Sequence, residues 1–253
     1  MNEVQENEVP DDVPIINENT DLVPREYKIF NDRLDEADVA TDLGVRVTNN
    51  ANTSTVFSVP KLLNDDDYYS KMERLNDKQR RFMLHILSCV KSDKNLPIQY
   101  IVLGSAGVGK SVLIEALHQS LLRHYYATEP NCNPEDMYVQ LCASTGKVAC
   151  NILGITLHSF LKLPINQDSL LPLSSSVKNS LYAKLHKLKF ILIDEISMVG
   201  SRVLRFTNER LQQIFDNKRP FGGISIIAFG DFNQLKPVMD KPIYKYIKTF
   251  VIQ

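Results

Sequence analysis

The sequence predicts an α/β domain in which helices cover both faces of a parallel β-sheet. Several short runs along the chain are apolar throughout, which is typical of strands buried on both faces. Segments with apolar residues at helical spacing separate these runs, as in repeated strand–helix units. The predicted strands are Tyr100–Leu103, Tyr138–Ala143, Phe190–Ile193 and Ser225–Phe229. Ligands of such sheets bind beyond the carboxyl ends of the strands, so the residues that follow each strand are the first candidates for a site.

The first 63 residues differ in composition from the rest. Residues 1–24 contain seven acidic residues, no Lys or Arg, and three prolines. Such a segment lacks the apolar surface that a core needs. We therefore expect residues 1–63 to be an acidic, largely disordered N-terminal region and residues 64–253 to form the folded domain. Without the acidic start, basic residues outnumber acidic ones, which permits a polyanionic partner.

The sequence disfavours a membrane-spanning protein and a protein with an N-terminal targeting signal. No apolar run approaches the 18 residues or so that a membrane-spanning helix needs. The N-terminus has neither the apolar core of a secretory signal nor the Arg-rich, acid-poor character of a transit peptide. The four cysteines show no C-x-x-C spacing, which favours buried free thiols over a zinc site. We expect a soluble, intracellular protein without a membrane partner.

The predicted helices begin after a segment rich in Asp. A short helix is expected over Tyr68–Leu75, and Asn76 with Gln79 forms the pattern of a capping box before the next one. A helix follows the first strand from near Lys110, and a short one leads from Thr145 toward Gly154. Two more are expected over Val177–Leu188 and Arg202–Phe215.

A glycine-rich loop joins the first strand to its helix and has the pattern G-x-x-x-x-G-K-S. This strand–loop–helix context is what a phosphate-binding loop requires, because backbone N–H groups must approach a polyphosphate closely. We expect Lys110 to reach the β and γ phosphates of ATP and Ser111 to hold Mg²⁺. A purely structural turn would have no use for these two side chains. The expected nucleotide-binding residues are Gly104, Ser105, Ala106, Gly107, Val108, Gly109, Lys110 and Ser111.

Acidic and amide side chains follow two other predicted strands. Asp194 comes directly after the most apolar strand, where it can hold the Mg²⁺ that Ser111 also contacts. Glu195 can orient or deprotonate a water for attack on the γ phosphate. Gln234 is placed to sense that phosphate after the last strand. The catalytic candidates are therefore Lys110, Asp194, Glu195 and Gln234; the structural alternatives are a helix cap at the acids and a simple turn at Gln234.

Hydroxyl and basic residues after the second strand favour contacts with single-stranded nucleic acid. Thr145 and Lys147 follow that strand, and His158 and Ser159 follow a short loop. Such residues bind phosphates, and aromatic rings nearby can stack on bases. Taken alone, a histidine such as His158 is more often a satisfied structural residue.

Five motifs in this order resemble the PIF-type DNA helicases of superfamily 1, over about residues 65–240. They are Leu75–Gln79, Gly104–Ser111, Ala143–Lys147 with Thr156–Ser159, Ile193–Met198, and Phe221–Gly223 through Val238. The resemblance implies a RecA-like P-loop NTPase domain in which Gln79 recognises adenine. It also implies ATP-driven 5′-to-3′ translocation on single-stranded DNA, work in DNA repair, recombination and telomere maintenance, and a nuclear location.

The chain departs from the family pattern at three places. Leu153 replaces a common glycine, and Lys236 replaces a common proline in a way that is similar to the Helitron-transposon branch. After Asp240 the resemblance fades, before a second RecA-like domain with its arginine finger, which is worth ~10³ to 10⁵ in rate. We therefore expect a monomeric first motor domain, a truncated fragment that binds Mg-ATP, hydrolyses it slowly and cannot unwind DNA alone.

Three alternatives stay open. One is a non-catalytic nucleotide- or DNA-binding remnant of a transposon-derived helicase. A GTPase is disfavoured because Asn217-Lys218 is not followed by the Asp that guanine recognition needs. A small-molecule kinase is disfavoured because no Arg-rich lid segment follows the core. ATP turnover with and without single-stranded DNA separates these possibilities.

Overall fold

The computed structural model describes residues 62–92, 96–129, 133, 135–165, 167–243 and 249–251. Apart from Leu62 and Leu63, the predicted acidic N-terminal region lies outside these residues, and so does Cys132. The prediction of disorder there therefore stays a prediction.

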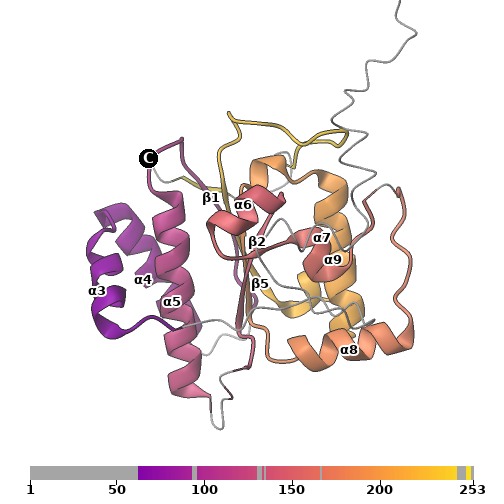
Figure 1. The fold of residues 1–253 in the computed structure, drawn as a ribbon, viewed down its shortest axis with the longest axis horizontal. Coiled ribbons are helices and arrows are strands. Elements are labelled where there is room, and N and C mark those ends of the chain that lie inside the picture. The colour runs from indigo at the N-terminus through magenta and orange to yellow at the C-terminus, as the bar shows by residue number, and fades with distance from the viewer. Residues whose placement is uncertain are drawn as a thin grey trace, which may run out of the picture. The chain divides into compact units, whose positions relative to one another are not determined.

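A 6-stranded sheet with the order β3-β2-β4-β5-β1-β6 forms the centre of the fold (Figure 1). Every strand pairing in it is parallel, which confirms the predicted sheet type. The strands are β1 (Gln99–Leu103), β2 (Val139–Ala143), β3 (Ile155–Thr156), β4 (Phe190–Asp194), β5 (Ser225–Gly230) and β6 (Thr249–Val251). The short strands β3 and β6 were not predicted, because two or three residues are too few to show a periodicity.

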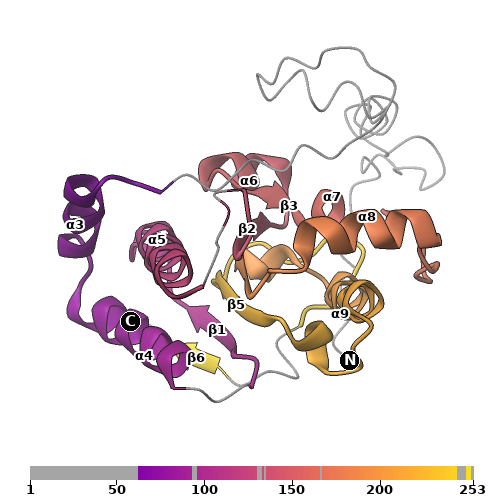
Figure 2. The same ribbon diagram turned by 90° about the horizontal axis from the view of Figure 1, so that it is seen from below.

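Helices cover both faces of the sheet, as predicted; α3, α4 and α5 lie on one side and α7, α8 and α9 on the other (Figure 2). Their bounds are α3 (Asp65–Glu73), α4 (Asp77–Lys91), α5 (Lys110–Thr128), α6 (Gly146–Asn151), α7 (Leu157–Leu161), α8 (Ser175–Leu185) and α9 (Ser201–Phe215). Two short 3-10 helices are η1 (Ile196–Met198) and η2 (Pro220–Gly223). Helix α8 begins two residues before the predicted start, because Ser174 caps it by accepting a hydrogen bond from the Val177 N–H.

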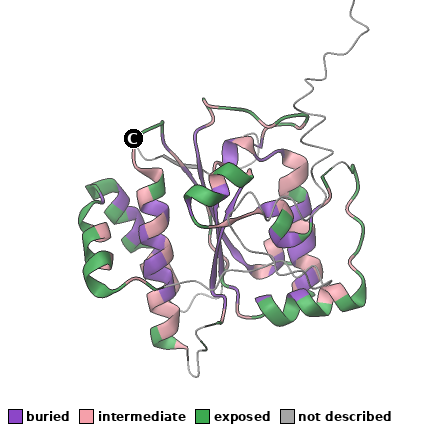
Figure 3. Cartoon of the chain, in the orientation of Figure 1, coloured by how far each residue is buried: buried purple, intermediate pink, exposed green. Residues whose placement is uncertain are grey.

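Neighbouring residues of one strand belong to different cores. Val102 packs into the core that contains α4 and α5, whereas Ile101 packs into the core that contains α7, α8 and α9. Strands β2, β4 and β5 are therefore buried on both faces, while the outer sides of the helices stay exposed (Figure 3). Each fully buried Leu or Ile contributes about 1.5–3 kcal/mol, so the two cores fix the sheet from both faces.

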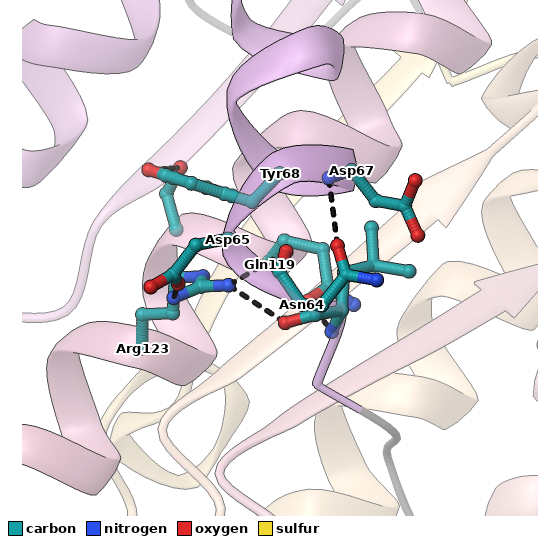
Figure 4. A network of polar contacts seen from close by, with 8 residues as sticks. Asn64, Asp65, Asp67, Tyr68, Gln119 and Arg123 are labelled. Carbon is teal, nitrogen blue, oxygen red and sulfur yellow. Dashed lines mark hydrogen bonds and ion pairs between the residues drawn. The ribbon is translucent and has the colours of Figure 1, made fainter.

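A polar network fastens α3 to α5 (Figure 4). The Arg123 guanidinium donates to Asp65 Oδ1 and to the Leu63 carbonyl, both at 2.7 Å, and lies 4.3 Å from the centroid of the Tyr68 ring. The side-chain amide oxygen of Gln119, Oε1, accepts a hydrogen bond from the Leu63 N–H at 3.0 Å. Because α4 follows α3 directly, this network also fixes where α4 meets the glycine-rich loop.

Helix α6 ends in a turn with a strained residue. The Leu153 N–H donates to the Cys150 carbonyl and the Gly154 N–H to the Ala149 carbonyl, the two bonds of a Schellman motif. Leu153 has φ 52 at the left-handed position of this motif, which favours glycine, and its side chain is 87% exposed. The loop geometry is therefore formed despite the departure from the family pattern, at a cost in backbone strain.

The cysteines correct one expectation. Cys142 is buried, but Cys89 is only partly buried and Cys150 is exposed. The sequence placed all of them in apolar helical or strand patterns, and Cys150 lies on the outer side of the short helix α6. Among the described helices none is both long and apolar enough to cross a lipid bilayer.

Leu153→Gly should raise the free energy of unfolding by about 0.5–1 kcal/mol, because glycine relieves the left-handed strain and little packing is lost. Urea denaturation measures this. Leu84→Gly, at an exposed position inside α4, is the matched control and should lower stability by a similar amount. A loss of stability in Leu153→Gly would contradict the account of this turn.

Acid should destabilise the domain through His118 on α5. Burial lowers the pKa of this side chain to about 4, partly opposed by a hydrogen bond with the Val139 backbone. The folded-state pKa lies below the ordinary value of 6.5, so the stabilisation from neutral His118 is complete above pH 6.5 and is lost as pH falls toward 4. We expect a loss of about 1–3 kcal/mol over this range, measured by denaturation at each pH.

His118→Gln should flatten this part of the pH profile. His186→Gln is the control, since His186 is exposed at the end of α8 and its replacement should leave the slope unchanged. Equal slopes for the wild-type chain and His118→Gln would show that another group controls the acid sensitivity.

Candidate functional site

Three loops meet at the carboxyl edge of the sheet. In the strand register, Leu103 of β1 pairs with Gly230 of β5, and Ile193 of β4 pairs with Ala228 of β5. The Gly104 N–H donates to the Gly230 carbonyl at 3.1 Å. The structure therefore brings the residues that follow β1, β4 and β5 side by side, as the sequence predicted.

The glycine-rich loop has the backbone that phosphate binding needs. Gly107 and Gly109 have φ values of 78 and 82, which residues with a side chain rarely adopt. Gly109 is the N-cap of α5, so the positive end of that helix faces the loop. The Lys110 ammonium donates to the carbonyls of Gly104 at 2.7 Å and Ser105 at 3.1 Å. The lysine is thus held over the loop by two bonds that phosphate oxygens can replace.

Gln79 lies beneath this loop and is 3% exposed. Its Nε2 donates to the carbonyls of Val108 at 2.9 Å and Gly109 at 3.2 Å, and its Oε1 accepts from the Asn76 N–H at 3.0 Å. The predicted capping box is confirmed. Recognition of adenine by Gln79 stays a prediction, and it would have to use the second lone pair of Oε1 or replace a bond to the loop.

The acidic pair lies opposite Lys110. Asp194 ends β4, is 6% exposed and accepts a hydrogen bond from the Glu195 N–H at 2.8 Å. Burial raises the pKa of Asp194, and the charge of Lys110 opposes this rise. Burial and then the charge of Asp194 raise the pKa of Glu195, again opposed by Lys110. Glu195 also has a left-handed backbone, φ 53, a strain that is commonly found at functional sites.

These donors fit a Mg²⁺ ion that is shared with a nucleotide. Mg²⁺ prefers one or two carboxylates and completes its shell with phosphate oxygens and water. The described residues contain no group of three or more His, Cys, Asp or Glu that could hold a metal by themselves. Asp194 with the exposed hydroxyl of Ser111 therefore offers a partial shell that a triphosphate can complete.

Gln234 lies in a turn built by Asp231. The Asp231 carboxylate accepts from the Asn233 N–H at 3.0 Å, and its carbonyl accepts from the Gln234 N–H at 3.0 Å. This turn leaves Gln234 half-exposed at the edge. Asp231 is 8% exposed, and its charge further raises the pKa of Glu195. The sequence analysis missed Asp231 as a third acid of the site, although its position directly after β5 could have identified it.

A second missed residue, Asp240, connects this turn to α9. The N-cap of α9 is Gly200, which has no side chain to cap with. Asp240 supplies the cap instead: its Oδ2 accepts from the Arg202 N–H at 3.0 Å, and the next carbonyl, of Lys241, accepts from the Ser201 N–H at 2.8 Å. A Cβ at Gly200 would lie 2.0 Å from Asp240 Oδ2. The loops that follow β4 and β5 therefore join again at the start of α9.

The residues predicted to contact DNA take two kinds of position. Thr145 caps α6, accepting from the Val148 N–H at 3.5 Å, so its hydroxyl has a structural role. Lys147 and Ser159 are exposed at this edge, and the Ser159 hydroxyl accepts a hydrogen bond from the Thr156 hydroxyl at 2.9 Å. His158 is half-buried, and burial lowers its pKa, so it is neutral at physiological pH. These residues follow the paired strands β2 and β3. Their contact with DNA stays a prediction.

This chain is similar to several DNA helicases of known sequence. The model of the PIF1-like helicase family matches residues 74–253. The ATP-dependent DNA helicase PIF1 of Candida albicans is 41% identical over 140 residues, which cover 54% of this chain and 14% of that protein. The ATP-dependent DNA helicase RRM3 of Saccharomyces cerevisiae is 34% identical over 147 residues, which cover 57% of this chain and 19% of that protein.

Among solved structures, the crystal structure of Pif1 helicase from Candida albicans matches with 35% identity and a TM-score of 0.47, over 65% of this chain and 34% of that one. This chain spans about a seventh of the length of the Candida relative and about a fifth of the Saccharomyces one.

Gly200→Ala should lower the free energy of unfolding by about 1–2 kcal/mol, because the new Cβ displaces the Asp240 carboxylate and leaves the N-terminus of α9 without a cap. Asp240→Ala should cost a similar amount, and Asp240→Asn less, since the amide oxygen can still accept. The matched control is Gly146→Ala, where a Cβ would meet no atom within 4 Å. Unchanged stability of Gly200→Ala in urea denaturation would contradict the role of Asp240.

Proposed function

This chain belongs to the PIF1-like helicase family, and from that membership we propose that it binds ATP with Mg²⁺ and powers movement along single-stranded DNA. Residues 64–253 would form the first motor domain of a 5′-to-3′ DNA helicase. The observation that carries the proposal is the charge cluster at the carboxyl edge, where Lys110 interacts with the buried carboxylate of Asp194 and the half-buried carboxylate of Glu195. The relatives that match are named ATP-dependent DNA helicases, which supports the same activity.

Each residue of the edge has a distinct part in the proposal. The loop amides and the end of α5 bind the phosphates, and Lys110 exchanges its bonds to Gly104 and Ser105 for phosphate oxygens. Ser111 and Asp194 hold the metal ion. Bound Mg-ATP supplies the free energy of hydrolysis. Glu195 accepts the proton of the attacking water, a role that its raised pKa suits.

The proposed DNA contacts lie along the ends of β2 and β3. Lys147 would bind a backbone phosphate as an exposed cation, and Ser159 and His158 would donate hydrogen bonds to phosphate or sugar oxygens. The same proposal includes the 5′-to-3′ direction of movement. It also includes work in DNA repair, recombination and telomere maintenance, and a nuclear location. The Helitron-like assignment from Lys236 stays a prediction.

Lys110→Ala should weaken the binding of Mg-ATP at least tenfold while the far-UV circular dichroism spectrum stays unchanged, because the substitution removes a phosphate ligand without opening either core. Lys178→Ala, at a half-exposed position on α8 away from the loop, is the control and should bind as the wild-type chain does. Isothermal titration calorimetry gives both affinities. Equal binding by Lys110→Ala would assign the loop a structural role only.

Glu195→Gln should keep the affinity for Mg-ATP and lower turnover by about 10² or more, because the amide cannot accept the proton of the water. Turnover is measured as phosphate release with and without single-stranded DNA. Tight ATP binding without any turnover, with or without DNA, would favour the non-catalytic alternative.

A further inference from the structure

A cavity of about 280 Å³ lies on the side of the sheet covered by α7, α8 and α9. Its walls come from the end of α7, the loop that leads to α8, the first turn of α8 and the middle of α9 (Figure 1). None of its lining residues belongs to the nucleotide site or to the proposed DNA contacts. Pockets that bind small molecules have volumes from about 300 Å³ upward, so this cavity is close to the lower end of that range.

The cavity contains a buried arginine without an acidic partner. Arg210 of α9 is 3% exposed and donates to the Leu171 carbonyl at 3.1 Å, Gln213 Oε1 at 2.8 Å and the Lys162 carbonyl at 3.4 Å. All of these acceptors are neutral. Its Nε is buried and has no hydrogen-bond partner within the described part of the chain. A buried charge is ordinarily compensated by an opposite charge, and this guanidinium has only neutral acceptors around it.

Two acidic side chains of the segments around the cavity pair with other arginines. Asp168, in the loop before α8, pairs with Arg202 at 2.6 Å, and Glu209, the neighbour of Arg210, pairs with Arg205 at 3.2 Å. No ion pair between Arg210 and a carboxylate is found among residues 62–92, 96–129, 133, 135–165, 167–243 and 249–251. Burial lowers the pKa of Arg210, with no carboxylate to oppose it.

Two further features add positive potential. Lys162 lines the cavity next to Arg210. The N-terminal end of α8, a helix of 11 residues, also lines it through Ser174 and Val177, and its first turn contains no acidic residue. The remaining wall is apolar and includes Leu163 and Leu173. The cavity thus combines a cationic end with apolar sides, and its lining contains no acidic residue.

We propose that this cavity binds a small ligand with an oxyanion head group and an apolar body, the head group being held by Arg210 and Lys162. A guanidinium matches the oxygens of a carboxylate or a phosphate with parallel hydrogen bonds. The apolar wall accommodates a ring or a short aliphatic chain. The inference is independent of the proposed ATP site, because the two sites share no residue.

The test uses the full chain with the Lys110→Ala substitution, which weakens binding of the phosphate probe at the glycine-rich loop. The probes are phenyl phosphate and phenylacetate, with phenylacetamide as the uncharged control, at constant ionic strength. Heteronuclear NMR titration should show saturable shifts in residues 162–177 and around Arg210. The probe that binds more tightly identifies the head group as phosphate or carboxylate, and phenylacetamide should bind at least tenfold more weakly than either.

Arg210→Gln should weaken binding at least tenfold and Lys162→Gln about threefold, whereas Lys178→Gln, outside the cavity on α8, should change nothing. Because Arg210 also supports two loop carbonyls, its replacement could unfold this region; Lys162→Gln, at an exposed side chain, then decides the matter in a folded chain. No saturable shift in residues 162–177 with either anion, or equal binding of phenylacetamide, would overturn the proposal and leave Arg210 as a structural support.

Discussion

The constraint on which the site depends is the placing of two adjacent carboxylates, one buried and one half-buried, beside one lysine. Asp194 is buried and Glu195 half-buried at the sheet edge, and burial is the largest cause of the rise in both their pKa values. Lys110 offsets only part of this cost. A cation that joins this edge, such as the Mg²⁺ of a metal-bound triphosphate, would further stabilise the charged carboxylates. The strain at Glu195 agrees with an edge shaped for a ligand rather than for stability.

Hydrogen bonds and close contacts connect the elements around this edge. Gln79 ties α4 to the glycine-rich loop through two hydrogen bonds, and the Gly104–Gly230 bond ties that loop to the end of β5. Gly230 approaches η1 so closely that a Cβ there would lie 2.9 Å from Ile196 Cγ2. Asp240 then returns the chain to the start of α9. Covalent and hydrogen-bonded contacts thus connect the phosphate-binding loop to the helices on both faces of the sheet.

Sequence patterns predicted the parallel sheet, its long helices and the edge where Lys110 meets Asp194, because each depends on local periodicity or on a residue that directly follows a strand. They did not predict the roles of Gly200 and Asp240, since a cap supplied from 40 residues away leaves no local pattern. The strained Leu153 was visible only as a departure from the family glycine, and its φ required coordinates. The exposure of Cys150 was missed because a helix as short as α6 has too few residues to define a buried face.

The central claim is that a nucleotide bridges the loops after β1, β4 and β5. Hydrogen exchange measured by mass spectrometry, with and without a non-hydrolysable ATP analogue and Mg²⁺, tests it directly. The account predicts slower exchange in peptides that contain Gly104–Ser111, Asp194–Met198 and Asp231–Gln234, together and at the same nucleotide concentration. Protection of the glycine-rich loop alone, or of none of the three, would contradict it.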